Sequence, residues 1–482
     1  MTGAPPPPPR RGPARKRPGG PSKRAGSPPP RRDRPQPDAP RRAAFDLLRA
    51  VDERDAYANL TLSGLVRERG LEGRDAGFAT ELGYGTLRGL GTYDAVLAAC
   101  VDRPLGSVDP PVRDVLRLGV HQLLAMRVPP HAAVGATVEL ARAVVGEGAG
   151  SFVNAVLRRV GRSDLAAWLA QVAPSLDDDP VGHLSVVHSH PRWVVSAIRD
   201  ALGGDLDETA AALAADNEPA AVTLVARPGR ADPAELLVEG ARPGAFAPYA
   251  VVLSGGDPAA LPAVREGRAG VQDEGSQLVA LALAAAEVDG AGGSGERWLD
   301  VCSGPGGKAA LLGALARQRG AALLAGERAP HRARLVRSAA GDDASVVVVD
   351  GRTPAWVDDT FDRVLLDAPC TGLGALRRRP EVRWRRTESD VAPLAALQGE
   401  LLWRAVDAAR PGGVVAYVTC SPHLAETRAV VGDLLRRRSD VVREDARPLL
   451  PGVPALGPGP DVQLWPHRHG TDAMYLALLR RV

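Results

Sequence analysis

The stretch Arg297–Gln318, "RWLDVCSGPGGKAALLGALARQ", decides the fold class of this chain. It begins as an apolar strand, passes through a glycine-rich turn and continues as a helix pattern, which is how a βαβ unit opens. Further strand patterns follow it, and their last residues are Glu327, Asp350, Asp367 and Cys420. Because strand and helix patterns alternate, we predict an α/β domain over residues 269–482, with a parallel, doubly wound, Rossmann-like sheet.

Two other regions precede this domain. Residues 42–162 place apolar residues at three- and four-residue spacing between Pro and Gly breaks, which predicts an all-α bundle. Residues 163–268 combine helix patterns such as "HPRWVVSAIRDALG" with strand patterns such as "AAVTLVARPG", which indicates a small α+β subdomain. We therefore expect a multidomain protein.

The first residues have a different composition. Residues 1–42 contain twelve Lys and Arg, two Asp and fourteen of the 43 prolines. Such a segment cannot build a core, so residues 1–41 are expected to be a disordered basic tail. The tail suits contact with a polyanion such as RNA, and a purely solubilising role is the alternative.

Composition excludes several classes of protein. No apolar run approaches the ~18 residues that a membrane span needs, and the Arg- and Pro-rich start is no secretory signal. The four cysteines have no paired spacing, and no CxxC or Cys/His cluster is present. We therefore expect a cytoplasmic protein, with no membrane or metal partner, and a monomer.

The strand ends suggest a nucleoside cofactor. The loop "CSGPGGK" is neither GxGxxG nor a P-loop, yet it lets backbone N–H groups approach an anionic group at a helix N-terminus. Glu327 is placed to accept hydrogen bonds from ribose hydroxyls, and Asp350 suits an adenine amino group. Both acids could instead only cap the following helices. Lys308 is one of three lysines in the chain and the only one outside residues 1–41, which hints at a chemical role.

The cysteines distinguish between NAD and S-adenosylmethionine as that cofactor. A thiolate that adds to C6 of a pyrimidine makes C5 nucleophilic, which divides a difficult methyl transfer into two steps. The chemistry needs a thiol, an acid near N3 of the ring and a base for the C5 proton. "DAPC" and "TC" supply Asp367, Cys370 and Cys420 at adjacent strand ends, and a dehydrogenase has no such need. The alternative is that both cysteines are buried structural residues.

The segment "RRRPEVRWRR" follows "DAPC" and places six arginines around a tryptophan. Basic charge beside an aromatic ring suits phosphate contacts next to a stacked, unpaired base. A solvated charged loop is the alternative. The residues predicted to contact RNA are Arg377, Arg378, Arg379, Arg383 and Trp384.

At this point several motifs, in order and spacing, resemble one family. "DVCSGPGGK", "DGRTPAW", "FDRVLLDAPCTGLGALRRRPEVRW" and "VTCSP" are similar to motifs of the bacterial Sun/Fmu members of the NOP-type RNA (cytosine-5) methyltransferases. "GVQDEGSQ" resembles their entry into the catalytic domain. "ELGYGTLRGLGTYD", "PPHAAVGATVELAR" and "FVNAVLRRV" resemble the NusB-like helical RNA-binding domain of this subfamily. The likeness covers nearly everything from Arg42 onward.

The resemblance implies a role for each matching residue. Residues 269–482 would be a class I methyltransferase domain that binds S-adenosylmethionine, its ribose on Glu327 and its adenine on Asp350. Asp367 would lie between cofactor and target base, Cys420 would be the nucleophile, and Cys370 would assist product release. The loop that cradles the cofactor would be Cys302, Ser303, Gly304, Pro305, Gly306, Gly307 and Lys308. The chain departs from the family where relatives often have "CAAPGGK", and where Asp is common at the position of Glu327.

The expected function is therefore methylation of C5 of a cytosine in 16S rRNA, as in the family member that acts on cytosine 967. The same chemistry on tRNA is one alternative. A NusB-like RNA-binding factor with a vestigial catalytic domain is the other.

Overall fold

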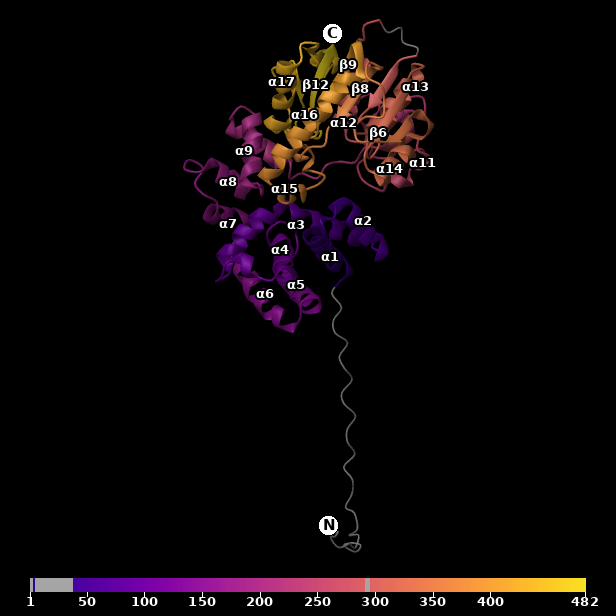
Figure 1. Ribbon diagram of the computed structural model, residues 1–482. Helices are drawn as coiled ribbons and strands as arrows, with labels where there is room; N and C mark the ends of the chain where they lie inside the picture. The colour runs from indigo at the N-terminus through magenta and orange to yellow at the C-terminus, as the bar shows by residue number, and fades with distance from the viewer. Residues whose placement is uncertain (1–2, 5–37, 291–294) are drawn as a thin grey trace, which may run out of the picture. The chain divides into compact units, whose positions relative to one another are not determined.

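A single mixed sheet forms the centre of the catalytic region (Figure 1). The computed structural model describes residues 3–4, 38–290 and 295–482. The eight-stranded sheet has the order β10-β12-β9-β8-β5-β6-β7, and β11 pairs with β12. Its strands are β5 (Arg297–Asp300), β6 (Ala322–Glu327), β7 (Ser345–Val348), β8 (Phe361–Asp367), β9 (Ala409–Thr419), β10 (Val441–Glu444), β11 (Val462–Gln463) and β12 (Tyr475–Arg481).

The central strands β9, β8, β5, β6 and β7 are parallel, and β12 and β10 add an antiparallel edge. This confirms the predicted doubly wound α/β class, but the sheet is mixed and not wholly parallel. A seven-residue strand pattern cannot show the direction of an edge strand, because hairpin and crossover neighbours present the same alternation.

Both faces of the sheet are covered by helices, as the sequence of β8 requires. Val364 and Leu366 pack against α16 and α17 on one face, whereas Leu365 packs with α12 and α13 on the other. Alternate residues of a strand point to opposite faces, so an apolar run buries both. The helices of this region are α12 (Glu274–Ala285), α13 (Gly307–Gln318), α14 (Pro330–Ala340), α15 (Val382–Arg385), α16 (Val391–Ala408), α17 (Arg428–Arg437) and α18 (Pro466–His469).

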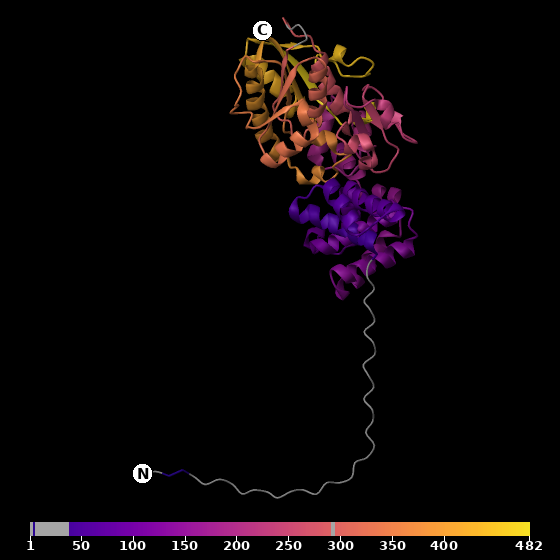
Figure 2. The same ribbon diagram turned by 90° about the vertical axis from the view of Figure 1, so that its right-hand side faces the viewer.

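The predicted helical bundle is present in the first part of the chain (Figure 2). Its helices share one apolar core that includes Leu82, Leu97, Leu116 and Leu157, all buried. Within α1 the core residues Ala44, Leu47 and Leu48 recur at three- and four-residue spacing, which puts them on one face of the helix. The helices are α1 (Ala39–Arg54), α2 (Ala58–Glu68), α3 (Gly73–Cys100), α4 (Pro110–Leu124), α5 (Pro130–Val144) and α6 (Glu147–Val160). The predicted tail lies outside the described residues except for residues 3–4 and 38–41.

A smaller α+β region joins the two. It contains a four-stranded antiparallel sheet of order β2-β3-β1-β4. Because β4 begins at Ala269 and pairs with β1, this sheet extends just past the expected boundary at residue 268. The elements are α7 (Leu165–Val172), α8 (Pro180–Val187), α9 (Arg192–Ala201), α10 (Leu206–Ala215), β1 (Thr223–Ala226), β2 (Arg242–Pro243), β3 (Ala250–Val252), α11 (Pro262–Arg265) and β4 (Ala269–Val271).

Candidate active site

The strand order reverses between β5 and β8, and the predicted site residues gather there. From β5 the chain proceeds outward to β6 and β7, and then returns to the other side of β5 with β8 and β9. Ligands of open α/β sheets bind beyond the carboxyl ends of the strands at such a point. The loop of residues 302–308 follows β5, Asp367 ends β8 and Cys420 follows β9, so the three lie at the same edge.

The two cysteines at this edge are in contact. The Sγ atoms of Cys370 and Cys420 are 3.4 Å apart, and both residues are half-buried. The hydrogen bond from Cys370 lowers the pKa of Cys420 below its usual value, and the ammonium of Lys308 acts in the same sense. The same hydrogen bond, together with burial, raises the pKa of Cys370. The pair therefore favours a thiolate at Cys420 and a thiol at Cys370.

Lys308 and Asp367 form an ion pair beside the thiols. The Nζ atom of Lys308 is 2.9 Å from Oδ2 of Asp367, and both side chains are largely shielded from solvent. Burial alone would lower the pKa of Lys308, but the charge and hydrogen bond of Asp367, together with the nearby Cys420 and Asp300, outweigh it and the pKa is raised. Lys308 thus stays an ammonium, which explains why an arginine-rich chain keeps a compact point charge at this position.

The glycine-rich loop is shaped by close approach of its backbone to neighbouring residues. Gly306 has φ +115°, and a Cβ there would lie 2.9 Å from the Cα of Val336 in α14. A Cβ on Gly304 would lie 2.0 Å from Oε2 of Glu327. Gly306 therefore needs glycine for both backbone conformation and space, whereas a Cβ on Gly304 would displace the carboxylate of Glu327. The hydroxyl of Ser303 donates to the carbonyl of Gly326, so this side chain holds the loop against β6.

The two predicted strand-end acids already have protein partners. Oε1 of Glu327 accepts a hydrogen bond from the backbone N–H of Ala329 at 2.8 Å. Asp350 accepts bonds from the backbone and guanidinium of Arg352, and Arg352 lowers the pKa of Asp350 to about 2. Glu327 therefore acts as a cap through Oε1, as the alternative expected, while its Oε2 faces Gly304. Asp350 is already bonded to Arg352, so an adenine amino group would have to share the carboxylate with that guanidinium.

One acid of this edge was missed by sequence reasoning. Asp300 ends β5, is fully buried, and neither of its carboxylate oxygens has a hydrogen-bond partner within the described ranges. Burial, aided by the charge of Asp367, raises the pKa of Asp300 to about 8. Its only signal in the sequence is an acid inside "WLDVC", where an apolar residue would be expected. A buried carboxylate without a partner is costly, and a cationic ligand group would satisfy it.

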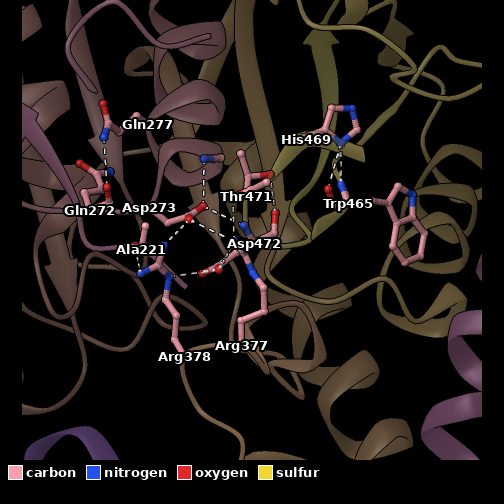
Figure 3. Close-up of polar contacts among 12 residues, drawn as sticks. Ala221, Gln272, Asp273, Gln277, Arg377, Arg378, Trp465, His469, Thr471 and Asp472 are labelled. Atoms are coloured by element: carbon pink, nitrogen blue, oxygen red, sulfur yellow. Dashed lines mark hydrogen bonds and ion pairs between the residues drawn. The ribbon is translucent and has the colours of Figure 1, made fainter. Parts of the chain in front are cut away.

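Arg377 and Arg378 of the arginine-rich segment point toward acids and carbonyl groups of the protein (Figure 3). Arg378 donates to the carboxylates of Asp273 and Asp472 at 2.6 and 3.1 Å. Arg377 is buried and contacts Asp472 and the carbonyl of Gly470. Both guanidiniums therefore connect the start of α12 to the loop before β12. Among the five residues predicted to contact RNA, only Arg379 is exposed.

Arg383 and Trp384 lie between the catalytic and helical regions. The Arg383 side chain is fully buried and donates to Oδ1 of Asn217 at 2.7 Å and to the carbonyl of Ser189 at 3.1 Å. The Trp384 ring lies so close to Gly91 of α3 that a Cβ there would be 2.5 Å from it. Arg383 donates through both terminal nitrogens to protein acceptors inside the fold, and its Nε has no hydrogen-bond partner among the described residues, so its contact with RNA stays a prediction.

The buried hydrogen bonds of Arg383 are expected to stabilise the fold. Arg383→Met should lower the free energy of unfolding by about 3 kcal/mol, because it leaves several buried acceptors unpaired. Arg379→Met, at the exposed position of the same segment, should change it by less than about 1 kcal/mol, since Arg379 makes only a stacking contact on Tyr57. Urea unfolding of both variants checks this. Equal stability of the two variants would contradict the structural role of Arg383.

Neither a membrane helix nor a metal cluster is found in the part of the chain that the structure describes. No helix there is long and apolar enough to cross a membrane. No group of three or more His, Cys, Asp or Glu side chains there could hold a metal ion.

Known proteins resemble the chain over nearly its whole length. The family model described as 16S rRNA methyltransferase RsmB/F matches residues 291–480, and the NusB family model matches residues 38–162. A Mycobacterium tuberculosis protein named as a methyltransferase is 55% identical over 449 residues, which are 92% of this chain and 97% of that protein.

Two further proteins are similar to the chain over the same share of its length. The Bacillus subtilis protein named ribosomal RNA small subunit methyltransferase B is 31% identical over 460 residues, covering 92% of this chain and 98% of the relative. The crystal structure of the protein PH0851 has a TM-score of 0.74 and 21% identity, covering 92% and 98% of the two chains, and it shows the same fold. The chain therefore belongs to the RsmB/F family of 16S rRNA methyltransferases, in the form that carries an N-terminal NusB-family domain, and is an RNA methyltransferase.

Proposed function

We propose that the chain methylates C5 of a cytosine in 16S rRNA through a covalent bond between Cys420 and C6 of that base, with S-adenosylmethionine as methyl donor. The observation that carries this proposal is the contact of two thiols, 3.4 Å apart at the ends of β8 and β9, beside the Lys308–Asp367 ion pair. A methyltransferase acting on an already nucleophilic atom, such as an amine, needs neither thiol.

In the first step Cys420 attacks. Its sulfur forms a bond to C6, and the electron pair of the C5–C6 double bond moves onto the ring, where it makes C5 nucleophilic and places charge toward N3. Asp367 ends β8 at the same sheet edge as the thiols, and its ion pair with Lys308 holds a donor group and a positive charge there. The ammonium of Lys308, held in place by Asp367, offsets the negative charge that develops on the base.

In the second step the product leaves. Once C5 carries the methyl group, its proton must be removed so that the C6–sulfur bond can break and Cys420 can depart as a thiolate. Cys370 is held against the Cys420 sulfur. Once that sulfur is bonded to C6 it no longer shares the Cys370 proton, so Cys370 passes this proton to water and, as a thiolate, takes the C5 proton as the base.

The residues at the carboxyl ends of the strands suit S-adenosylmethionine as the methyl donor. The buried carboxylate of Asp300, which has no hydrogen-bond partner among the described residues, suits the ammonium of the methionine part. Glu327 is proposed for the ribose and Asp350 for the adenine. The remaining loop residues proposed to hold it are Cys302, Ser303, Pro305, Gly306, Gly307 and Lys308. When bound, S-adenosylmethionine supplies the methyl group as an electrophile.

The proposal of 16S rRNA as the substrate is based on the names of the family and of a relative. The family description names 16S rRNA, and the B. subtilis relative is named for the small-subunit RNA. We propose the same RNA for this chain, with the position equivalent to cytosine 967 as the first candidate. The NusB-family region over residues 42–162, the basic tail over residues 1–41 and the exposed Arg379 are proposed to contact the RNA backbone.

The test is methyl transfer from labelled S-adenosylmethionine to purified 16S rRNA and, in parallel, to bulk tRNA, followed by mass spectrometry of nuclease fragments. We expect a single 5-methylcytosine in 16S rRNA and none in tRNA. Methylation of tRNA alone would replace the proposed target. RNA binding without binding of the donor in calorimetry would favour a NusB-like binding factor instead.

A further inference from the structure

Glu426 is a buried acid that the proposed mechanism does not use. It ends the short 3-10 helix η7 (Leu424–Glu426) after Cys420 and is fully buried. A carboxylate in such a place must find hydrogen-bond donors, or its burial is costly. The donors it finds belong to both cysteine loops.

The residue after each cysteine donates to this one carboxylate. Thr371, which follows Cys370, donates its backbone N–H to Oε1 at 2.7 Å and its hydroxyl to Oε2 at 2.5 Å. Ser421, which follows Cys420, donates its hydroxyl to Oε2 at 2.7 Å. The loops after β8 and β9 are therefore joined through Glu426, and the separation of the two sulfurs follows from that link.

Two further buried side chains, those of Gln398 and Tyr417, hold Glu426 in place. The amide of Gln398 in α16 donates to Oε1 of Glu426 at 3.2 Å and to the carbonyl of Pro369 at 2.8 Å. The hydroxyl of Tyr417 donates to the backbone carbonyl of Glu426 at 2.7 Å. All these side chains are buried, so the group forms one satisfied polar network inside the fold.

The charge of Glu426 acts on one thiol more than on the other. The charged groups around the pair are Asp367 at the end of β8, Lys308 in α13, Asp472 before β12 and Glu426. After its hydrogen bond and burial, Cys370 has Glu426 among the causes that raise its pKa. Lys308 instead acts on Cys420 and lowers its pKa. Apart from the thiols themselves, Cys370 thus has only carboxylates, those of Glu426 and Asp367, among the charged groups that act on it, whereas Cys420 has the ammonium of Lys308 beside the carboxylates of Asp367 and Asp472.

We propose that Glu426 is a positioning residue that holds the two thiols in contact and keeps their shared proton on Cys370, so that Cys420 is the thiol ready to attack. The inference rests on the cysteine roles given under the proposed function. The difference between two neighbouring cysteines then comes from a buried carboxylate that accepts hydrogen bonds from the residue after each of them.

The first test separates charge from geometry with two variants. Glu426→Gln keeps the size of the side chain but removes its charge, whereas Glu426→Asp keeps the charge but is too short to reach both loops. Each should lower kcat of methyl transfer by about 100-fold, with KM for RNA changed by less than about threefold. Glu388→Gln, at an exposed acid of η6 (Glu388–Asp390), is the matched control and should behave as wild type.

The second test measures the reactivity of the two thiols directly, without RNA or S-adenosylmethionine. Limiting iodoacetamide at neutral pH, followed by peptide mass spectrometry, gives the ratio of label on Cys420 to label on Cys370. Wild type and Glu426→Asp should label mainly Cys420, and Glu426→Gln should lower the ratio by about tenfold or more because thiolates are the reactive form. Circular dichroism establishes that each variant is folded.

The outcomes are decisive in either direction. An unchanged labelling ratio in folded Glu426→Gln would overturn the proposal, even if activity fell. If Glu426→Gln does not fold, Glu426→Asp decides: a ratio that still favours Cys420 with reduced kcat supports it, and a ratio that moves toward Cys370 overturns it. Because the labelling needs no RNA, it stands or fails independently of whether the product is 5-methylcytosine.

Discussion

Cys420→Ala is expected to abolish methyl transfer, with kcat lower by about 10⁴-fold or more, as for removal of other enzymatic nucleophiles. The reason is that C5 of cytosine is not nucleophilic until a group has added to C6, and Cys420 is the thiol whose pKa is lowered in this site. The variant should also form no covalent complex with RNA that contains 5-fluorocytosine. Methyl incorporation and denaturing gels measure the two effects.

The control for this variant is a cysteine far from the sheet edge. Cys100 is buried in the helical core at the end of α3, so Cys100→Ala removes a thiol without touching the site. It should keep its activity and lose only a little stability. Full activity of Cys420→Ala would show that another group attacks the base.

Cys370→Ala is expected to have a different phenotype. Attack by Cys420 and transfer of the methyl group remain possible, but the base for the C5 proton is missing, so the C6–sulfur bond does not break. The variant should accumulate a protein–RNA species that survives denaturing electrophoresis on unmodified RNA, and its turnover should fall by about 10²–10⁴-fold, the range for loss of a general base.

The double variant is the control for this expected covalent complex. Cys370→Ala combined with Cys420→Ala should form no covalent species, because the bond to RNA is made by Cys420. A stable complex in Cys420→Ala and none in Cys370→Ala would reverse the two roles. The sequence alone could not decide between them, since "PC" and "TC" both place a thiol at a strand end.

The parts of the site that sequence predicted are those set by local strand and turn patterns. The Gly-rich turn, Asp367 and the two cysteines each end an apolar strand, and parallel strands bring their carboxyl ends to one edge. That is why the structure finds Cys370 beside Cys420 and Lys308 beside Asp367. The contacts follow from topology, which the alternation of strand and helix patterns determines.

The parts that sequence did not predict depend on partners far away in the chain. A run of arginines gives no sign that Arg383 will be covered by residues 166 positions earlier, such as Asn217. The same holds for Arg378, whose carboxylate partners precede and follow it by about a hundred residues. Asp300 and Glu426 were missed because one acid in an apolar or loop segment has no distinctive spacing. Their burial is visible only once the fold is known.

The most direct measurement of the central claim is tritium release from 16S rRNA labelled at C5 of its cytosines. Substitution at C5 must expel that hydrogen, so the account predicts one tritium released for each methyl group incorporated, and release lost in Cys420→Ala. Methyl incorporation into the same RNA without tritium release would place the methyl group on another atom and would contradict the account.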